Sequence, residues 1–194
     1  MTTTELKNEL NKVANNKKIL YHGGRKKFTK IYPKYMFIDS SNAQEGIGIY
    51  FTPYLEVAQK YGKHVMFIEI EDFKKFIDSY AIASDVYKLY EIEKVVDLIK
   101  VNDKDELYYY ITNWMEIDYD SSVDELKEAF KSILPDMLEN EIRNFHVELA
   151  EIFGVEEFVN AWNKVFGNRF YGTYNPKLEF YAVMNTKIKV NVLM

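Results

Sequence analysis

Three short segments of this chain carry side chains that could take part in chemistry. The first, Leu-Tyr-His-Gly-Gly over residues 20–24, ends an apolar run with His22 and follows it with Gly23 and Gly24. Glycines beside an imidazole let a ligand approach the backbone closely. A histidine at a strand end is also a common structural hydrogen-bonding residue, so this segment predicts a ligand site only in combination with the others.

The second segment runs from Gly46 to Gly62 and contains two tyrosines eleven positions apart. Tyr50 belongs to an apolar run flanked by glycines, and Tyr61 ends the predicted helix that follows. Two aromatic rings so placed could sandwich a flat ligand ring, including one whose positive charge changes during a reaction. The alternative is that both tyrosines belong to the hydrophobic core.

The third segment places Glu179 at the start of an otherwise apolar run, Glu-Phe-Tyr-Ala-Val-Met over residues 179–184. A carboxylate at the mouth of a buried strand is costly unless it serves a ligand or a reaction. The alternative is an exposed glutamate at a strand start.

Taken together, these motifs resemble the His-Tyr-Glu branch of the ADP-ribosyltransferase superfamily. The resemblance rests on His-Gly in the first strand, on Gly-x-Gly-Ile-Tyr-Phe-Thr with a downstream Ala-x-x-Tyr-Gly, and on Glu-Phe-Tyr-Ala-Val near the C-terminus. The resemblance covers about residues 18–71 and 165–192. That branch of the superfamily includes the diphtheria-toxin-like and poly(ADP-ribose) polymerase catalytic domains. The resemblance implies NAD as co-substrate and an α+β fold, with a split mixed or antiparallel β-sheet core interrupted by a helical insertion.

The resemblance also implies a role for each matched residue. His22, Tyr50 and Glu179 would form the catalytic triad. His22 would orient the adenosine ribose of NAD, Gly23 would offer backbone N–H and C=O groups to the nicotinamide amide, and Glu179 would bind the 2′-hydroxyl of the nicotinamide ribose. Tyr50 and Tyr61 would stack on the nicotinamide ring. The full set expected to bind NAD is His22, Gly23, Gly24, Tyr50, Phe51, Thr52, Ala58 and Tyr61.

Ala58 departs from the pattern of the polymerase-type members, which carry a serine three positions before the second tyrosine. The serine hydroxyl contacts the nicotinamide amide in those proteins. Its absence removes one hydrogen bond, about 1 kcal/mol, and should weaken inhibitors that mimic nicotinamide.

The predicted activity is transfer of ADP-ribose from NAD to a macromolecule, with a mono-transferase favoured over a polymerase because the chain is small. A protein acceptor is favoured, and a nucleic-acid acceptor is the weaker alternative. An NAD glycohydrolase and a catalytically silent binding module on the same fold remain alternatives. Family analogy suggests a phage or bacterial effector acting in the cytoplasm, which would be the host cytoplasm for a phage protein.

The hydrophobic periodicity predicts strands near both ends of the chain and helices between them. The expected strands cover residues 19–22, 46–52, 64–70, 178–184 and 187–193, with Asn185-Thr186 as a tight turn between the last two. The expected helices cover residues 4–15, 53–61, 84–99, 104–114, 123–134, 136–153 and 155–166, with Asp103 and Ser122 as N-caps. The predicted catalytic core therefore consists of residues 1–72 and 165–194, and residues 73–164 form a helical insertion that recognises the target or caps the cleft. The first and last strands could pair across that insertion.

Composition excludes several other classes of protein. The 194 residues are 47% hydrophobic and carry a net charge of −5, which suits a globular core and argues against general nucleic-acid binding. A basic cluster near the N-terminus is interpreted as a solvated edge: Lys17, Lys18, Arg25, Lys26 and Lys27. The chain has no cysteine, and its three histidines show no metal-binding spacing, so we expect no metal. No apolar run is long enough to span a membrane.

Overall fold

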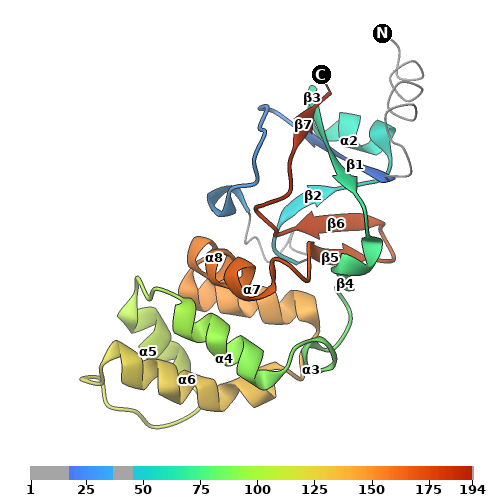
Figure 1. The fold of residues 1–194 in the computed structure, drawn as a ribbon. Coiled ribbons are helices and arrows are strands. Elements are labelled where there is room, and N and C mark those ends of the chain that lie inside the picture. Colours follow the sequence, from blue (N-terminus) through green and yellow to red (C-terminus); the bar gives the residue numbers. More distant parts are fainter. Residues whose placement is uncertain (1–17, 37–45, 194) are drawn as a thin grey trace.

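The computed structural model describes residues 18–36 and 46–193, so the helix predicted over residues 4–15 lies outside the described residues. The strands gather at one end of the molecule and most of the helices at the other (Figure 1). The mixed α+β class predicted from the sequence is confirmed.

Within the described residues, seven strands form two sheets. The three-stranded antiparallel sheet has the order β1-β3-β7, with β1 at Lys18–Gly24, β3 at His64–Ile70 and β7 at Asn191–Val192. The four-stranded sheet has the order β2-β6-β5-β4, with β2 at Ile49–Phe51, β6 at Phe180–Val183, β5 at Gly172–Asn175 and β4 at Phe76–Asp78. Its β4–β5 pair is parallel and its other pairs are antiparallel. A single antiparallel bridge, Tyr21↔Thr52, joins the two sheets.

The helices fall into two groups. Helix α2 (Leu55–Tyr61) packs on β1 and β3, and the short 3-10 helices η1 (Pro33–Tyr35) and η2 (Phe73–Lys75) lie in connections. The other helices lie between β4 and β5 in the chain: α3 (Ala83–Val86), α4 (Leu89–Leu98), α5 (Lys104–Thr112), α6 (Val123–Met137), α7 (Ile142–Phe153) and α8 (Val155–Phe166).

One continuous hydrophobic cluster joins the sheets to this second group of helices. It contains Leu20 of β1, Val183 of β6, Leu107 of α5 and Trp162 of α8, all of them inaccessible to solvent. Each buried side chain of this size contributes about 1.5–3 kcal/mol by leaving water. The helices therefore share a core with the sheets. The assignment of a separate function to residues 73–164 stays a prediction.

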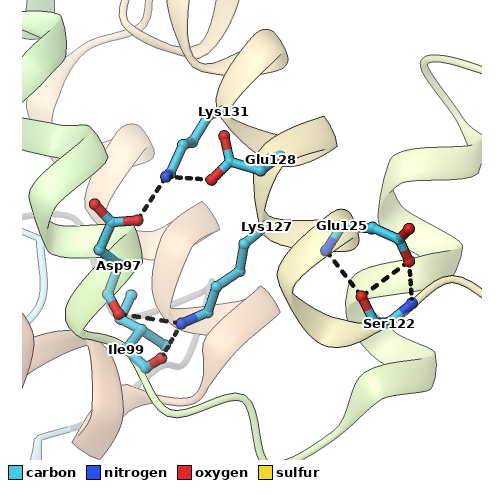
Figure 2. A network of polar contacts seen from close by, with 7 residues as sticks. All are labelled: Asp97, Ile99, Ser122, Glu125, Lys127, Glu128 and Lys131. Atoms are coloured by element: carbon cyan, nitrogen blue, oxygen red, sulfur yellow. Dashed lines mark hydrogen bonds and ion pairs between the residues drawn. The ribbon is translucent and has the colours of Figure 1, made fainter.

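Polar contacts fix the ends of α4 and α6 (Figure 2). Ser122 and Asp103 are the N-caps of α6 and α5, as predicted, and Glu125 completes a reciprocal capping box with Ser122. The Lys127 ammonium donates to the Asp97 and Ile99 carbonyls at 3.2 and 2.5 Å, and so satisfies acceptors at the C-terminal end of α4. Lys131 pairs with Asp97 at 2.5 Å. These contacts bind α6 to α4.

Two helices predicted as continuous are interrupted. The helix predicted over residues 84–99 breaks at Tyr87, whose extended backbone turns its side chain into the core. The helix predicted over residues 136–153 is also wrong at its start, because α6 continues through Pro135 to Met137. The Leu138 and Asn140 carbonyls then accept hydrogen bonds from residues 84 and 83, which a continuous helix would prevent.

The C-terminal hairpin predicted around Asn185-Thr186 is also wrong. Asn185 is buried, and its side-chain amide donates to the Gly167 and Phe170 carbonyls, so the chain crosses to the other sheet. There the last strand pairs with β3 rather than with the first strand. Strands β4 and β5, which pair across nearly one hundred residues, were not predicted, and the helical segment begins at Ala83 instead of residue 73.

A buried histidine makes the stability of this core depend on pH. The Trp162 indole N–H donates to the Tyr87 hydroxyl at 3.2 Å, and that hydroxyl lies 2.8 Å from His146 Nε2. The other ring nitrogen, Nδ1, has no hydrogen-bond partner among the described residues. Burial lowers the pKa of His146 to about 3, so the ring stays neutral in the folded protein at pH values where it is charged in the unfolded chain.

We expect His146→Phe to reduce acid sensitivity. Below the unfolded histidine pKa of about 6.5, the unfolded wild type binds a proton that the folded protein does not, so the free energy of unfolding falls by about 1.4 kcal/mol per pH unit down to the folded pKa. Urea titrations between pH 7 and pH 4.5 should show this extra loss in the wild type and not in the variant. Parallel pH dependences would contradict a neutral buried imidazole.

Candidate functional site

His22 lies in β1 with its imidazole turned toward β2. Its Nδ1 lies 2.7 Å from the Tyr50 carbonyl, and its ring packs against Phe28 and Phe51. A carbonyl only accepts hydrogen bonds, so Nδ1 must carry the proton. Burial lowers the pKa of His22, and the hydrogen bond to Tyr50 opposes this only in part. The ring is therefore neutral near pH 7, with Nε2 as the acceptor that a ligand hydroxyl could use.

Gly23 has backbone groups at the open edge of β1. Tyr21 exchanges two backbone hydrogen bonds with Thr52, at 2.7 and 2.8 Å. Val65 lies opposite Gly23 in the β1–β3 pair, and its carbonyl accepts a hydrogen bond from Leu193, on the side away from β1. Because hydrogen-bonded and non-hydrogen-bonded pairs alternate in an antiparallel ladder, the N–H and C=O of Gly23 point away from β3, to the same side as those of Tyr21. This placement could receive a carboxamide.

Gly23 and Gly62 also allow β1 to touch α2 and its C-terminal end backbone to backbone. A Cβ on Gly23 would lie 1.7 Å from the Ala58 carbonyl oxygen, and a Cβ on Gly62 would lie 2.3 Å from the Gly24 carbonyl. No side chain fits in either space. Gly23, which was predicted to bind the ligand, therefore has a structural role as well.

Tyr50 lies in β2 and is half-buried. Its hydroxyl donates to the Gly46 carbonyl at 2.7 Å, and its backbone pairs with Ala182 of β6. This pairing brings two segments 132 residues apart in the sequence side by side. Glu179 precedes Ala182 by three residues, or about 10 Å along a strand.

Glu179 ends the turn of residues 176–179 instead of standing in β6, where the sequence predicted it. It has a left-handed backbone, with φ of 54°, which costs a non-glycine residue about 1 kcal/mol. The turn is held by Asn175, whose side-chain oxygen accepts from the backbone N–H groups of Lys177 and Leu178. In a regular strand, residues 179 and 182 would face opposite sides of the sheet, and this turn interrupts that alternation.

Tyr54 is the residue that the sequence analysis missed. It lies just before α2, and its hydroxyl donates a hydrogen bond to the Glu179 carboxylate. This contact raises the pKa of the Tyr54 phenol. At the other end of α2, the Tyr61 ring packs edge-on against Phe180, with centroids 6.3 Å apart. Nothing in the sequence distinguishes Tyr54, four positions after Tyr50, as a site residue, because tyrosine is common in this chain.

The structure thus brings together β1, β2, α2 and the turn before β6, which carry most of the predicted residues. Tyr61 is 64% exposed and accessible to a ligand. Phe51, Thr52 and Ala58 are buried and hold β2 and α2 against β1. Their contacts with NAD stay predictions.

Other kinds of site gain no support from the described residues. Residues 18–36 and 46–193 contain no group of three histidine or acidic side chains that could hold a metal ion. Over the same residues, no helix has the length and apolar character needed to cross a membrane. A polar cavity of about 540 Å³ lies between the end of β3 and the crossover to β7, and it includes none of the predicted site residues.

Comparison with known proteins gives little further information. No family model matches the chain, and no curated protein matches it. One solved structure, the crystal structure of an anti-CRISPR protein, aligns with 91% of this chain and 95% of its own at 11% identity and a TM-score of 0.35. A similarity at this level supports no conclusion about fold or function.

We expect Gly23→Ala to loosen α2 from β1. The added methyl group overlaps the Ala58 carbonyl, and overpacking of this kind costs about 1–3 kcal/mol or more. Urea unfolding should show a lower midpoint. Gly154→Ala is the matched control, because nothing lies within 4 Å of its Cβ and its cost comes only from its φ of 85°. A smaller loss for Gly23→Ala than for Gly154→Ala would contradict the tight contact.

Proposed function

We propose that this protein is an NAD-dependent mono-ADP-ribosyltransferase with an ADP-ribosyltransferase-like core of two sheets. The observation that carries the proposal is the convergence of three distant segments, in which His22 contacts the Tyr50 carbonyl, Tyr50 pairs with Ala182, and Glu179 is held by Tyr54. These are the residues that the family resemblance assigns to NAD binding and catalysis.

In the proposed complex, His22 Nε2 accepts a hydrogen bond from the adenosine ribose, and the backbone of Gly23 binds the nicotinamide amide. Tyr50 and Tyr61 stack on the nicotinamide ring. A neutral His22 suits this role, because an imidazolium would have no acceptor nitrogen.

Glu179 would act on the bond that breaks. The bond between ribose C1′ and the nicotinamide nitrogen cleaves with its electron pair leaving on nicotinamide, and positive charge develops on the ribose, as in glycoside hydrolysis. A carboxylate at the 2′-hydroxyl stabilises that charge more than it stabilises bound NAD. The acceptor then forms a bond to C1′ and releases a proton, which Glu179 can receive.

The test is incubation of the purified protein and a cell lysate with NAD labelled in its adenylate part. Label on a macromolecule would support transfer, and mass spectrometry of lysate proteins and RNA, with Glu179→Ala as the blank, would identify the acceptor. Free ADP-ribose alone would indicate an NAD glycohydrolase. If the protein neither consumes NAD nor binds NAD in calorimetry, the proposal is overturned in favour of a catalytically silent binding module.

We expect Glu179→Gln to lower turnover by at least about 100-fold, the usual effect of removing one transition-state electrostatic contact. NAD binding should largely survive, because the amide still hydrogen-bonds a hydroxyl. Glu139→Gln, the same change at an exposed residue beyond α6, should leave turnover unchanged. Equal turnover of wild type and Glu179→Gln would exclude the mechanism.

We expect Tyr54→Phe to lower kcat by about 10-fold, the effect of losing one hydrogen bond, with little change in KM. The reason is that Tyr54 contacts the carboxylate and acts by positioning it. Tyr90→Phe, at another exposed tyrosine, is the matched control. An unchanged kcat in Tyr54→Phe, with Glu179→Gln still inactive, would mean that the contact is lost when NAD binds.

A further inference from the structure

An exposed cluster of tyrosines lies on α5 and on the loop that follows it. The aromatic–acidic surface consists of Asp105, Tyr108, Tyr109, Asp118, Tyr119 and Asp120. Tyr109 and Tyr119 are 62% and 50% exposed. Figure 1 shows α5 at the end of the helical region remote from the strands, so this surface is separate from the candidate site.

The rings of this surface are held in place by one another. The Tyr108 ring lies between the other two, with centroids 5.4 Å from Tyr109 and 5.0 Å from Tyr119. The Tyr119 hydroxyl donates to Asp105 at 3.1 Å, and Lys104 donates to the Tyr119 carbonyl at 2.9 Å. A partner that contacts these rings would therefore lose little entropy in ordering them.

One cation already occupies this surface. The Lys104 ammonium lies 5.4 Å from the centroid of the Tyr119 ring, within the range of a cation–π contact. The rings therefore accept a positive charge in the geometry they have, and the exposed Tyr109 ring offers a further face.

Charge is distributed unevenly along the chain in favour of a basic partner. Residues 103–125 contain eight of the 30 acidic residues and one of the 25 basic residues, so the rest of the chain is almost balanced. A phosphate backbone would be repelled by this surface. Guanidinium groups combine positive charge with a planar face that stacks on tyrosine, and ammonium groups lack that face.

We propose that the aromatic–acidic surface docks an arginine-rich segment of a partner protein. An arginine side chain stacks on the exposed ring of Tyr109, which no cation of this chain occupies, while the carboxylates of Asp105, Asp118 and Asp120 pair with the charge of the segment. The inference goes beyond the proposed function, because docking is measured without NAD and stands whether or not the protein transfers ADP-ribose.

The experiment uses the full chain and two fluorescent 12-residue peptides that each carry four basic residues separated by Gly-Ser, one with arginine and one with lysine. Anisotropy titrations should show about 3- to 5-fold tighter binding of the arginine peptide, the advantage of stacking at exposed sites. Tyr109→Ala should remove this preference. The triple variant Asp105→Asn, Asp118→Asn, Asp120→Asn should weaken the binding of both peptides by about 10-fold, because it removes three exposed charge pairs together.

The control is a triple variant with the same change in charge at exposed residues elsewhere: Glu139→Gln, Glu151→Gln and Glu156→Gln. It should bind both peptides as the wild type does, with circular dichroism showing that all variants fold. Equal losses in the two triple variants, or equal affinity of the wild type for both peptides, would overturn the proposal. A wild-type dimer in sedimentation that the aspartate triple variant abolishes would assign the surface to a second copy and overturn it as well.

Discussion

The arrangement of the candidate site depends on two backbone hydrogen bonds between Tyr21 and Thr52. They form the bridge that joins the two sheets, and both residues are almost inaccessible to solvent. Tyr21 directly precedes His22, and Thr52 follows Tyr50 by two residues, so this bridge sets the imidazole against the Tyr50 carbonyl. The bridge is short because the chain turns away at Pro53 to begin α2. The edge of β1 beyond the bridge is left open at Gly23, which is where the proposed ligand amide would bind.

Helix α2 and the residues at its ends contact both β1 and the segment of Glu179, the candidate carboxylate. Its inner side touches Gly23 and Gly24 through Ala58 and Gly62, where no Cβ can be accommodated. Tyr54 and Tyr61, at its two ends, contact Glu179 and Phe180. A shift of α2 would therefore change both the edge of β1 and the position of the carboxylate. Gly23 of the first motif thus has a reason to be a glycine that does not require a ligand, and its residue type alone could not separate the two roles.

The sequence predicted the local elements better than the contacts between them. Strand β1, strand β3, helix α2 and the caps Asp103 and Ser122 follow from apolar periodicity, glycine stops and side-chain hydrogen bonding, which act within a few residues. The break at Tyr87, the β4–β5 pair and the anchor at Asn185 depend on partners far away in the chain. Glu179 was predicted to be a site residue, and that stays a prediction, but its left-handed turn was not predicted, because Asn175 imposes it through side-chain hydrogen bonds. Tyr54 was missed for the same reason, since its importance lies in a contact across 125 positions.

The continuity of the hydrophobic core links the candidate site physically to the aromatic–acidic surface. A single cluster of buried side chains includes Leu20 beside His22, Val183 of β6 and Leu107 of α5. Close-packed interiors of this kind do not deform gradually, so α5 keeps a fixed position relative to the sheets. A partner held on the aromatic–acidic surface would then present its remaining surface to the candidate site at a constant distance and orientation. For a transferase this matters, because water can always capture the reactive ribose. A macromolecular acceptor competes with water only when binding at a second surface holds its nucleophile near the reacting carbon.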